Sequence, residues 1–311
     1  MTETPAAVAA DPPPREAPRA FASHPHRAEI VGEIHARPFR SARPPRVFLH
    51  HAFAVDRAMI EKDGAFLERF CRARGAPGPG PEARHHVLAF AGGTLAWERH
   101  AEFITYTWDG PLAEGATPFG PLPSNHPFGA DFEQPGPLLV AARVDLLAAS
   151  GDLAAAAATF EPASLCISEA YAGAVVALTD FRQDGDGRTR ILVLDRGLTA
   201  QQAGALAQRL LEIETYRTLA MLGLPLAQSL GPEVHRLERE LSVVTSEIRA
   251  SQGLAANRGL LERLAALSAE VENRAADASY RIGATRAYDQ IVTDRLAILD
   301  ERGVPGHSTW A

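Results

Sequence analysis

Three polar side chains of complementary chemistry stand on alternate positions near the N-terminus, in the stretch GEIHARPF at residues 32–39. They are Glu33, His35 and Arg37, and on a β-strand alternate residues point to one face of the sheet. A carboxylate beside a neutral imidazole can hold a divalent metal ion or transfer protons. The same groups also form ordinary ion pairs and hydrogen bonds at strand edges, and we favour this structural interpretation.

A second alternating set follows in WERHAEF, where Glu98, His100 and Glu102 stand two residues apart. We expect the two sets to form a polar cluster or a ligand site if their strands are neighbours. The weaker candidates for metal ligands are His24, His26 and His35. The pairs at 50–51 and 85–86 are weaker still, because adjacent strand residues face opposite sides and rarely share one ion. The candidate site residues are therefore Glu33, His35, Arg37, Glu98, His100 and Glu102.

The motifs that commonly mark an enzyme are missing from this sequence. It contains no Walker loop, no HExxH and no GxSxG. The run DGDG at 184–187 lacks the later ligands and the glutamate of a calcium loop. We therefore predict no catalytic residues, name no cofactor, and lean away from an enzyme.

Composition restricts the class of protein. The 311 residues carry a net charge of −7, which argues against a nucleic-acid-binding protein, since that class needs a basic surface. Two cysteines cannot make a disulfide framework and fit a reducing compartment. No apolar run is long enough to cross a bilayer, and the proline-rich start lacks the apolar region of a secretory signal. The chain as given is predicted to be soluble and cytoplasmic.

The elements that must position these residues change character along the chain. Alternating or β-branched stretches predict strands in the first two thirds, and DGDG predicts a hairpin turn between the last two strands. Residues 56–74 predict an amphipathic helix. A proline- and glycine-rich loop at 109–137 is long enough to be a surface insertion or a lid over a site. The predicted strands are 85–90, 94–100, 102–108, 138–147, 164–181 and 189–195.

From residue 198 the apolar spacing becomes that of packed helices. Thr199 and Gln202 are placed to form a capping box at the first helix, and Pro225 should end or kink it. Apolar residues then recur at steps of four and three through two runs, with a predicted break at Asn257–Gly259. This pattern predicts an antiparallel, coiled-coil-like helical hairpin. Its first seam is Leu237, Leu241, Val244 and Ile248.

The predicted fold class is therefore α+β, with a mixed or antiparallel sheet domain followed by an all-α hairpin. We assign residues 1–22 to a disordered tail, 23–197 to the α+β domain, 198–302 to the helical stalk, and 303–311 to a C-terminal tail.

Four blocks of this sequence resemble the bacterial DUF3422 family, described as predicted membrane-anchored proteins of unknown function. The blocks are HPHRAEIVGEIHARPF, WERHAEFITYTW, DRGLTAQQAGALAQRLLEIETYRTLAMLGLP and SYRIGATRAYDQIVTDRLAILDERGVPG. The resemblance implies a location on the cytoplasmic side of the inner membrane, through an anchor that this chain does not contain. It implies no catalytic residues. The order of domains is also similar in outline to that of CorA-type magnesium transporters.

Three functional hypotheses follow. The first is an interaction or regulatory module, membrane-associated in the intact family, with possible homo-oligomer formation through the C-terminal helices. The second is a metal-dependent or acid–base enzyme with its site near EIHARP and WERHAEF. The third is the soluble part of a CorA-like ion transporter.

Overall fold

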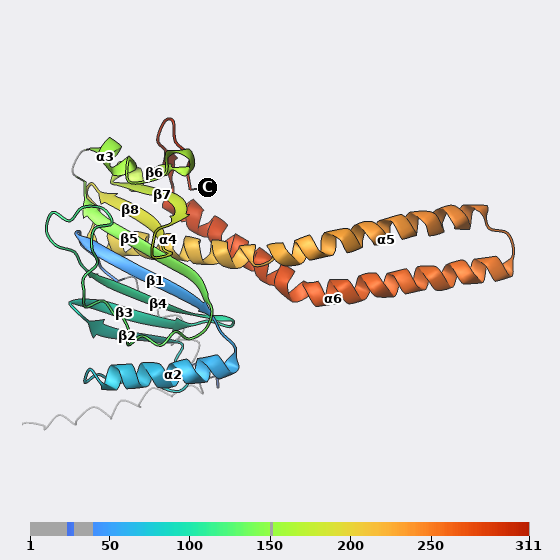
Figure 1. The fold of residues 1–311 in the computed structure, drawn as a ribbon, viewed down its shortest axis with the longest axis horizontal. Helices are drawn as coiled ribbons and strands as arrows, with labels where there is room; N and C mark the ends of the chain where they lie inside the picture. Colours follow the sequence, from blue (N-terminus) through green and yellow to red (C-terminus); the bar gives the residue numbers. More distant parts are fainter. Residues whose placement is uncertain (1–23, 28–39, 150–151, 311) are drawn as a thin grey trace, which may run out of the picture. The chain divides into compact units, whose positions relative to one another are not determined.

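Stretches rich in valine, isoleucine, leucine and aromatic residues build a nine-stranded mixed sheet in the part of the chain that the structure describes (Figure 1). The structure is a computed structural model and describes residues 24–27, 40–149 and 152–310. Neighbouring strands are antiparallel except β5 and β8, which are parallel. In spatial order the strands are β2 (His85–Phe90), β3 (Gly93–Arg99), β4 (Phe103–Pro111), β1 (Arg46–Ala54), β5 (Leu138–Ala148), β8 (Thr189–Asp195), β7 (Val175–Gln183), β6 (Cys166–Ala170) and β9 (Arg302–Gly303).

Five helices and two short 3-10 turns accompany the sheet in these residues. They are α2 (Arg57–Arg72), α3 (Leu153–Ala157), α4 (Ala200–Met221), α5 (Leu224–Ala250), α6 (Leu254–Leu299), η1 (Pro162–Ser164) and η2 (Tyr171–Gly173). The predicted α+β fold is confirmed: a mixed sheet with helices is followed by a long helical region. Contacts divide the chain at residue 38, and residues 39–311, which contain both the sheet and these helices, form one unit.

One face of the sheet is covered by α4. The predicted capping box is confirmed, since the Thr199 side chain accepts from the Gln202 amide and the Gln202 side chain accepts from the Thr199 amide. Apolar α4 residues such as Leu206 and Leu210 pack on β1, β5 and β8, where Val144 is fully buried. Burying this apolar stripe is the main force that holds the helix on the sheet.

A buried histidine adds a polar connection between α4 and the sheet. His50 Nδ1 lies 2.7 Å from Thr107 Oγ1 on β4, and His50 Nε2 lies 2.9 Å from Thr215 Oγ1 on α4. The Thr215 hydroxyl donates to the Leu211 carbonyl, so it accepts the proton from His50 Nε2. The neutral imidazole therefore satisfies both of its nitrogens, one on the sheet and one on the helix.

The opposite face is covered by α2 and by the long loop at 112–137. Phe66, Leu67 and Phe70 of α2 pack against β2, β3, β4 and β1, at the end of the sheet where α2 lies in Figure 1. The loop adds Phe128 and Phe132 to the same core. The loop predicted as an insertion or lid therefore lies on the sheet through its own aromatic side chains.

The C-terminal helices form the predicted hairpin, with α5 and the first part of α6 side by side (Figure 1). The chain passes from α4 to α5 at Gly223, and Pro225 stands in the first turn of α5, as expected for a residue without an amide proton. The break predicted at Asn257–Gly259 is wrong. The turn lies at residues 251–253, and α6 runs through Gly259 without interruption, because a single helical glycine costs only about 1 kcal/mol.

Two other predictions need correction. The strand predicted over 164–181 is two antiparallel strands, β6 and β7, joined by a turn in which Tyr171, Ala172 and Gly173 have positive φ. The central strand β1 was not predicted, because its apolar and histidine side chains are buried on both faces and no alternation marks it. At the C-terminal end, β9 (Arg302–Gly303) pairs with β6, and Trp310 lies in the core at 8% exposure.

Candidate functional site

The first predicted set of site residues falls outside the structural description. Glu33, His35 and Arg37 lie among residues 28–39, so their meeting with the second set stays a prediction. His24 and His26 are described, and the His26 amide donates to His24 Nδ1 at 3.2 Å. Within residues 24–27, 40–149 and 152–310, no group of three or more His, Cys, Asp or Glu side chains could hold a metal ion.

The second predicted set separates into two parts. Glu98 and His100 stay together, with Oε2 and Nε2 3.7 Å apart. The His100 ring stacks on Phe103 at a centroid distance of 4.0 Å. This geometry packs the imidazole between the end of β3 and the start of β4.

Glu102 points instead to the C-terminal hairpin. Its carboxylate accepts from Arg281 Nη2 at 2.8 Å and from the Tyr288 hydroxyl at 2.6 Å. Burial would raise the pKa of Glu102, but these two hydrogen bonds and the Arg281 charge outweigh it, and the pKa is lowered. Glu102 therefore fixes the inner part of α6 to the sheet at the turn before β4.

A cysteine–histidine pair lies between α2 and β2. Cys71 Sγ is 3.5 Å from His86 Nε2. Burial raises the pKa of the Cys71 thiol and lowers that of His86, so both groups are neutral at pH 7. A reactive cysteine needs the thiolate, and Cys71 lies in the core with the half-buried His86 beside it.

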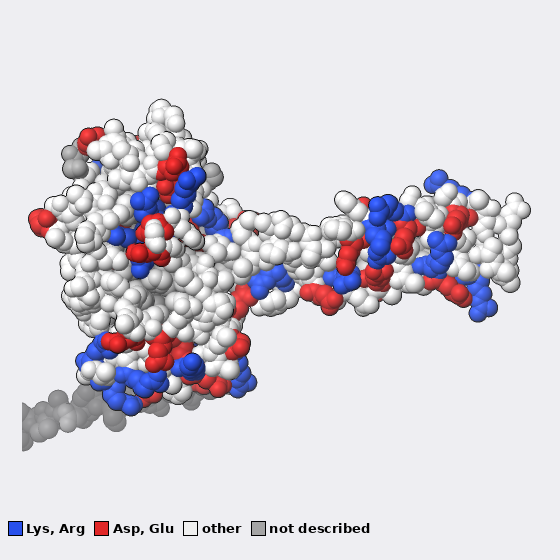
Figure 2. Space-filling view, in the orientation of Figure 1, with Lys and Arg blue, Asp and Glu red and all other residues white. Residues whose placement is uncertain are grey.

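One edge of the α5–α6 hairpin is charged. Ion pairs join the two helices at Glu233–Arg274, with 2.9 Å between Oε2 and Nε, and at Glu270–Arg236 and Glu247–Arg263. Figure 2 shows acidic and basic side chains next to one another over the outer part of the hairpin. At ~100° per residue, these residues lie roughly 40 to 100° to one side of the buried positions Leu237 on α5 and Leu260 on α6.

The other edge of the hairpin is apolar. On α5, Val234, Leu241 and Ile248 recur every seven residues, roughly 20 to 60° to the opposite side of Leu237. Their exposed fractions are 46%, 47% and 47%, although Leu237 and Val244 are buried. The ion pairs place the charged sides of both helices together, so the apolar sides also lie together. We name this surface the apolar edge: Val234, Leu241, Ile248, Leu264, Val271 and Ile282.

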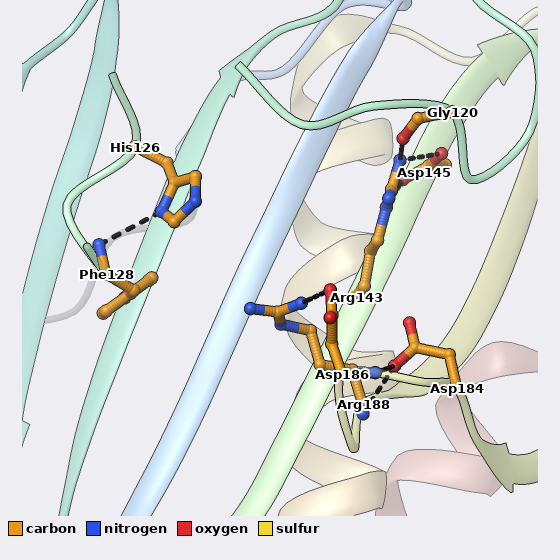
Figure 3. A network of polar contacts seen from close by, with 8 residues as sticks. All are labelled: Gly120, His126, Phe128, Arg143, Asp145, Asp184, Asp186 and Arg188. Carbon is orange, nitrogen blue, oxygen red and sulfur yellow. Dashed lines mark hydrogen bonds and ion pairs between the residues drawn. The ribbon is translucent and has the colours of Figure 1, made fainter. Parts of the chain in front are cut away.

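A buried polar network lies between the sheet and the 112–137 loop (Figure 3). Arg143 and Asp145 alternate with apolar residues on β5 and form an ion pair, with Nε and Oδ1 2.7 Å apart. The Phe119 amide donates to Asp145 Oδ2 at 2.8 Å, and Arg143 Nη2 donates to the Gly120 carbonyl at 2.9 Å. The pair therefore satisfies backbone groups of the loop and holds it on the sheet. Burial is the larger influence on the pKa of Asp145 and raises it, against the effect of Arg143.

A second group of polar contacts lies at the turn between β7 and β8 (Figure 3). Asp184 Oδ1 accepts from the amides of Asp186 and Arg188, at 2.9 and 3.0 Å, as the predicted DGDG turn requires. Arg188 Nη1 donates to Asp186 Oδ2 at 2.6 Å. His126, from the loop, points toward the Arg188 guanidinium in Figure 3.

Sequence reasoning missed these contacts because the residues come from β5, the turn between β7 and β8, and the loop, which are far apart along the chain. One signal was available: Arg143 and Asp145 interrupt an otherwise apolar strand. Charges in a buried strand are rare and need partners. For the hairpin, the heptad spacing was visible, but the spacing alone did not say which seam positions the partner helix covers.

The comparisons with known proteins give a family and no function. The family model described as "Protein of unknown function (DUF3422)" matches residues 22–311. No curated protein and no solved structure matches this chain. Among the helices described here, none combines the length and the apolar character needed to span a bilayer.

Proposed function

From the premise that this chain belongs to the DUF3422 family of proteins of unknown function, we propose that it is an interaction module that pairs with a second copy of itself. The pairing surface is the apolar edge of the α5–α6 hairpin. We also propose that this assembly acts at the cytoplasmic side of the inner membrane, as an adaptor or regulatory unit.

The single observation that carries the proposal is the unequal covering of the heptad seam. Leu237 and Val244 are buried by α6. The alternate positions of the same seam, Val234, Leu241 and Ile248, remain nearly half exposed. Three such residues at seven-residue intervals extend over about 21 Å of helix, at ~1.5 Å per residue. On this edge α6 covers only one of the two seam positions of α5, and a second hairpin packed against the edge would cover the other.

A second copy suits this surface because the edge is complementary to itself. Two identical apolar edges related by a two-fold axis place aliphatic side chains against aliphatic side chains. The three ion pairs that join the helices lie on the opposite edge, so pairing through the apolar edge would leave these six charges in place. The result would be a four-helix bundle.

The chain offers a matched pair of variants to test this proposal. Val234 and Val243 are both valines of α5, 46% and 50% exposed, but Val243 lies away from the apolar edge. Sedimentation velocity should show a concentration-dependent dimer for the wild type. The affinity of dimer formation should be at least tenfold weaker for Val234→Lys, and it should be unchanged for Val243→Lys. Circular dichroism would verify that all three are equally helical.

Three results would contradict the proposal. A wild-type monomer at every concentration would do so, as would equal weakening by both lysine substitutions. The third is a wild-type monomer that sediments with lipid vesicles and loses this binding in Val234→Lys, which would assign the apolar edge to a membrane surface.

A further inference from the structure

His51, Ala141 and Arg188 form a row across the loop-covered face of the sheet. The two residues at the ends of the row, His51 and Arg188, have side chains that carry nitrogen. His51 on β1 is directly opposite Ala141 on β5. The β5–β8 ladder begins with Ala142 opposite Thr189, so Arg188 comes next to Ala141 on the other side. Residues opposite one another in a sheet share a face. With strands ~4.8 Å apart, the backbones at His51 and Arg188 are separated by about 10 Å, and only the methyl group of Ala141 stands between them.

Among the residues that the structure describes, one buried nitrogen atom at each end of this row has no hydrogen-bond partner. These atoms are His51 Nδ1 and Arg188 Nε. His51 is itself more than nine-tenths buried, and the Arg188 side chain is 13% exposed. Buried polar groups are nearly always paired, and an unpaired one costs roughly 1–3 kcal/mol. Two such atoms on one face point to a partner molecule that accepts hydrogen bonds.

The loop contributes a third nitrogen to the same place. His126 Nδ1 accepts a hydrogen bond from the Phe128 amide at 3.2 Å, so the neutral ring carries its proton on Nε2. Figure 3 shows that the His126 ring and the Arg188 guanidinium point toward one another from the two sides of β1. The Phe128 ring contacts the His51 ring edge to face, with the ring centroids 4.3 Å apart.

The electrostatics around the row are those of a positive site. Burial lowers the pKa of His51 to about 3, and the charge of Arg188 adds to this effect. Burial also lowers the pKa of His126, again with a contribution from Arg188, while Asp186 acts in the opposite direction. The carboxylate that pairs with Arg188, Asp186, is 70% exposed and therefore well screened by water. The two imidazoles are neutral donors at pH 7, beside one guanidinium.

We propose that His51, His126 and Arg188 bind a small oxyanion, a carboxylate or a phosphate, over the methyl group of Ala141. The guanidinium would supply charge and directed N–H groups, and the two imidazoles would each supply one N–H. A cation is excluded by Arg188, and an apolar ligand would leave the buried nitrogens unpaired. This site is separate from the apolar edge of the hairpin and stands whether or not the chain forms dimers.

Thermal unfolding with added anions tests this site. The melting temperature of the wild type should rise to saturation with sodium phosphate or sodium acetate, compared with sodium chloride at equal ionic strength. The anion that gives the larger rise at equal concentration identifies the preferred class. Arg188→Gln removes the charge, and Ala141→Leu fills the space over the row while leaving every donor in place. Arg182→Gln is the matched control, because Arg182 is on the adjoining strand β7 and 62% exposed.

We expect the anion-specific rise to be lost in Arg188→Gln and Ala141→Leu and kept in Arg182→Gln. NMR of the wild-type imidazoles should also show a higher pKa for His126 when the anion is bound. If Arg188→Gln does not fold, Ala141→Leu decides the matter alone. A rise that never saturates or that chloride reproduces, which would mean an adventitious ion only, overturns the proposal. So does an equal response in wild type and Ala141→Leu.

Discussion

Replacing Glu102 with glutamine should loosen the connection between the helical hairpin and the sheet. Glutamine keeps the shape of the side chain and one acceptor oxygen, but it removes the charge that faces Arg281. Arg281 Nη1 and Nη2 lie 3.3 and 2.8 Å from the two carboxylate oxygens, and the Tyr288 hydroxyl lies 2.6 Å from Oε1. The substitution therefore acts on contacts that join the turn before β4 to two successive turns of α6.

The magnitude follows from burial and from the kind of hydrogen bond. The side chains of Glu102 and Arg281 are 18% and 24% exposed, so solvent screens the pair only in part. Hydrogen bonds to charged groups contribute about 1.5–3 kcal/mol each, and glutamine can keep the one from Tyr288. We expect the free energy of unfolding to fall by about 2 kcal/mol, and a double-mutant cycle with Arg281→Gln to give a coupling of about 1–2 kcal/mol.

Urea unfolding at pH 7 measures both quantities, and hydrogen exchange should show faster exchange in the part of α6 around residues 278–292. Glu61→Gln is the control, because the Arg57–Glu61 pair is 95% and 71% exposed and should contribute less than about 0.5 kcal/mol. The pKa of Glu102 is lowered in the folded chain, so its contribution is full above the unfolded value of about 4.3 and is lost as pH falls. A cycle with no coupling at pH 7, or with equal coupling at pH 7 and pH 3, would refute this reasoning.

Two further predictions concern buried groups on the two faces of the sheet. Asp145→Asn leaves Arg143 buried without a counter-charge. The free energy of unfolding in urea should fall by about 3–5 kcal/mol, and hydrogen exchange of the Phe119 amide should become faster. Glu161 is an exposed member of a 3.6 Å ion pair, and a loss no larger than that of Glu161→Gln would contradict this prediction. Burial lowers the pKa of His50 to about 4, below an unfolded value of about 6.5, so its contribution is full above pH 6.5 and lost as pH falls toward 4. The wild type should therefore lose about 3 kcal/mol more than His50→Gln between pH 7 and pH 4, and parallel stability curves for the two proteins would rule this out.

The fold class was predictable because local patterns and tertiary packing agree over most of the chain. In β4, Ile104, Tyr106 and Trp108 alternate as a strand requires, and all three are buried. Thr199 and Gln202 predicted the start of α4 because a capping box is a local hydrogen-bonded motif. Heptad spacing likewise predicted the paired helices.

The failures arose where pattern and packing disagree. In β1, apolar and histidine side chains face both ways because the strand is central and covered on both sides, so no alternation marks it. The turn of the hairpin is at 251–253, where Ser251 has an extended backbone and Gly253 has a φ of 101°, and not at the glycine that follows an asparagine and an arginine. Local composition is compatible with a turn at 251–253 or at 257–259. The pairing of side chains between the two helices determines which of the two is used.

The candidate sites divide in the same way. Glu102 was selected for its spacing from His100, yet its partner is 179 residues away on α6, a separation that no local pattern reveals. The placement of His51, His126 and Arg188 depends on the order of strands in the sheet, because the chain passes through β6 and β7 before β8 returns to pair in parallel with β5. Strand order is a property of the whole fold.

Spin labels can measure directly which edge of the α5–α6 hairpin a second copy of the chain covers. Both native cysteines are buried, so a nitroxide can be attached selectively at Val234→Cys or Val243→Cys. With excess unlabelled wild-type protein, the label at position 234 should become immobilised as concentration rises, while the label at position 243 stays mobile. Equal mobility at both positions over the whole concentration range would show that the apolar edge remains open to water.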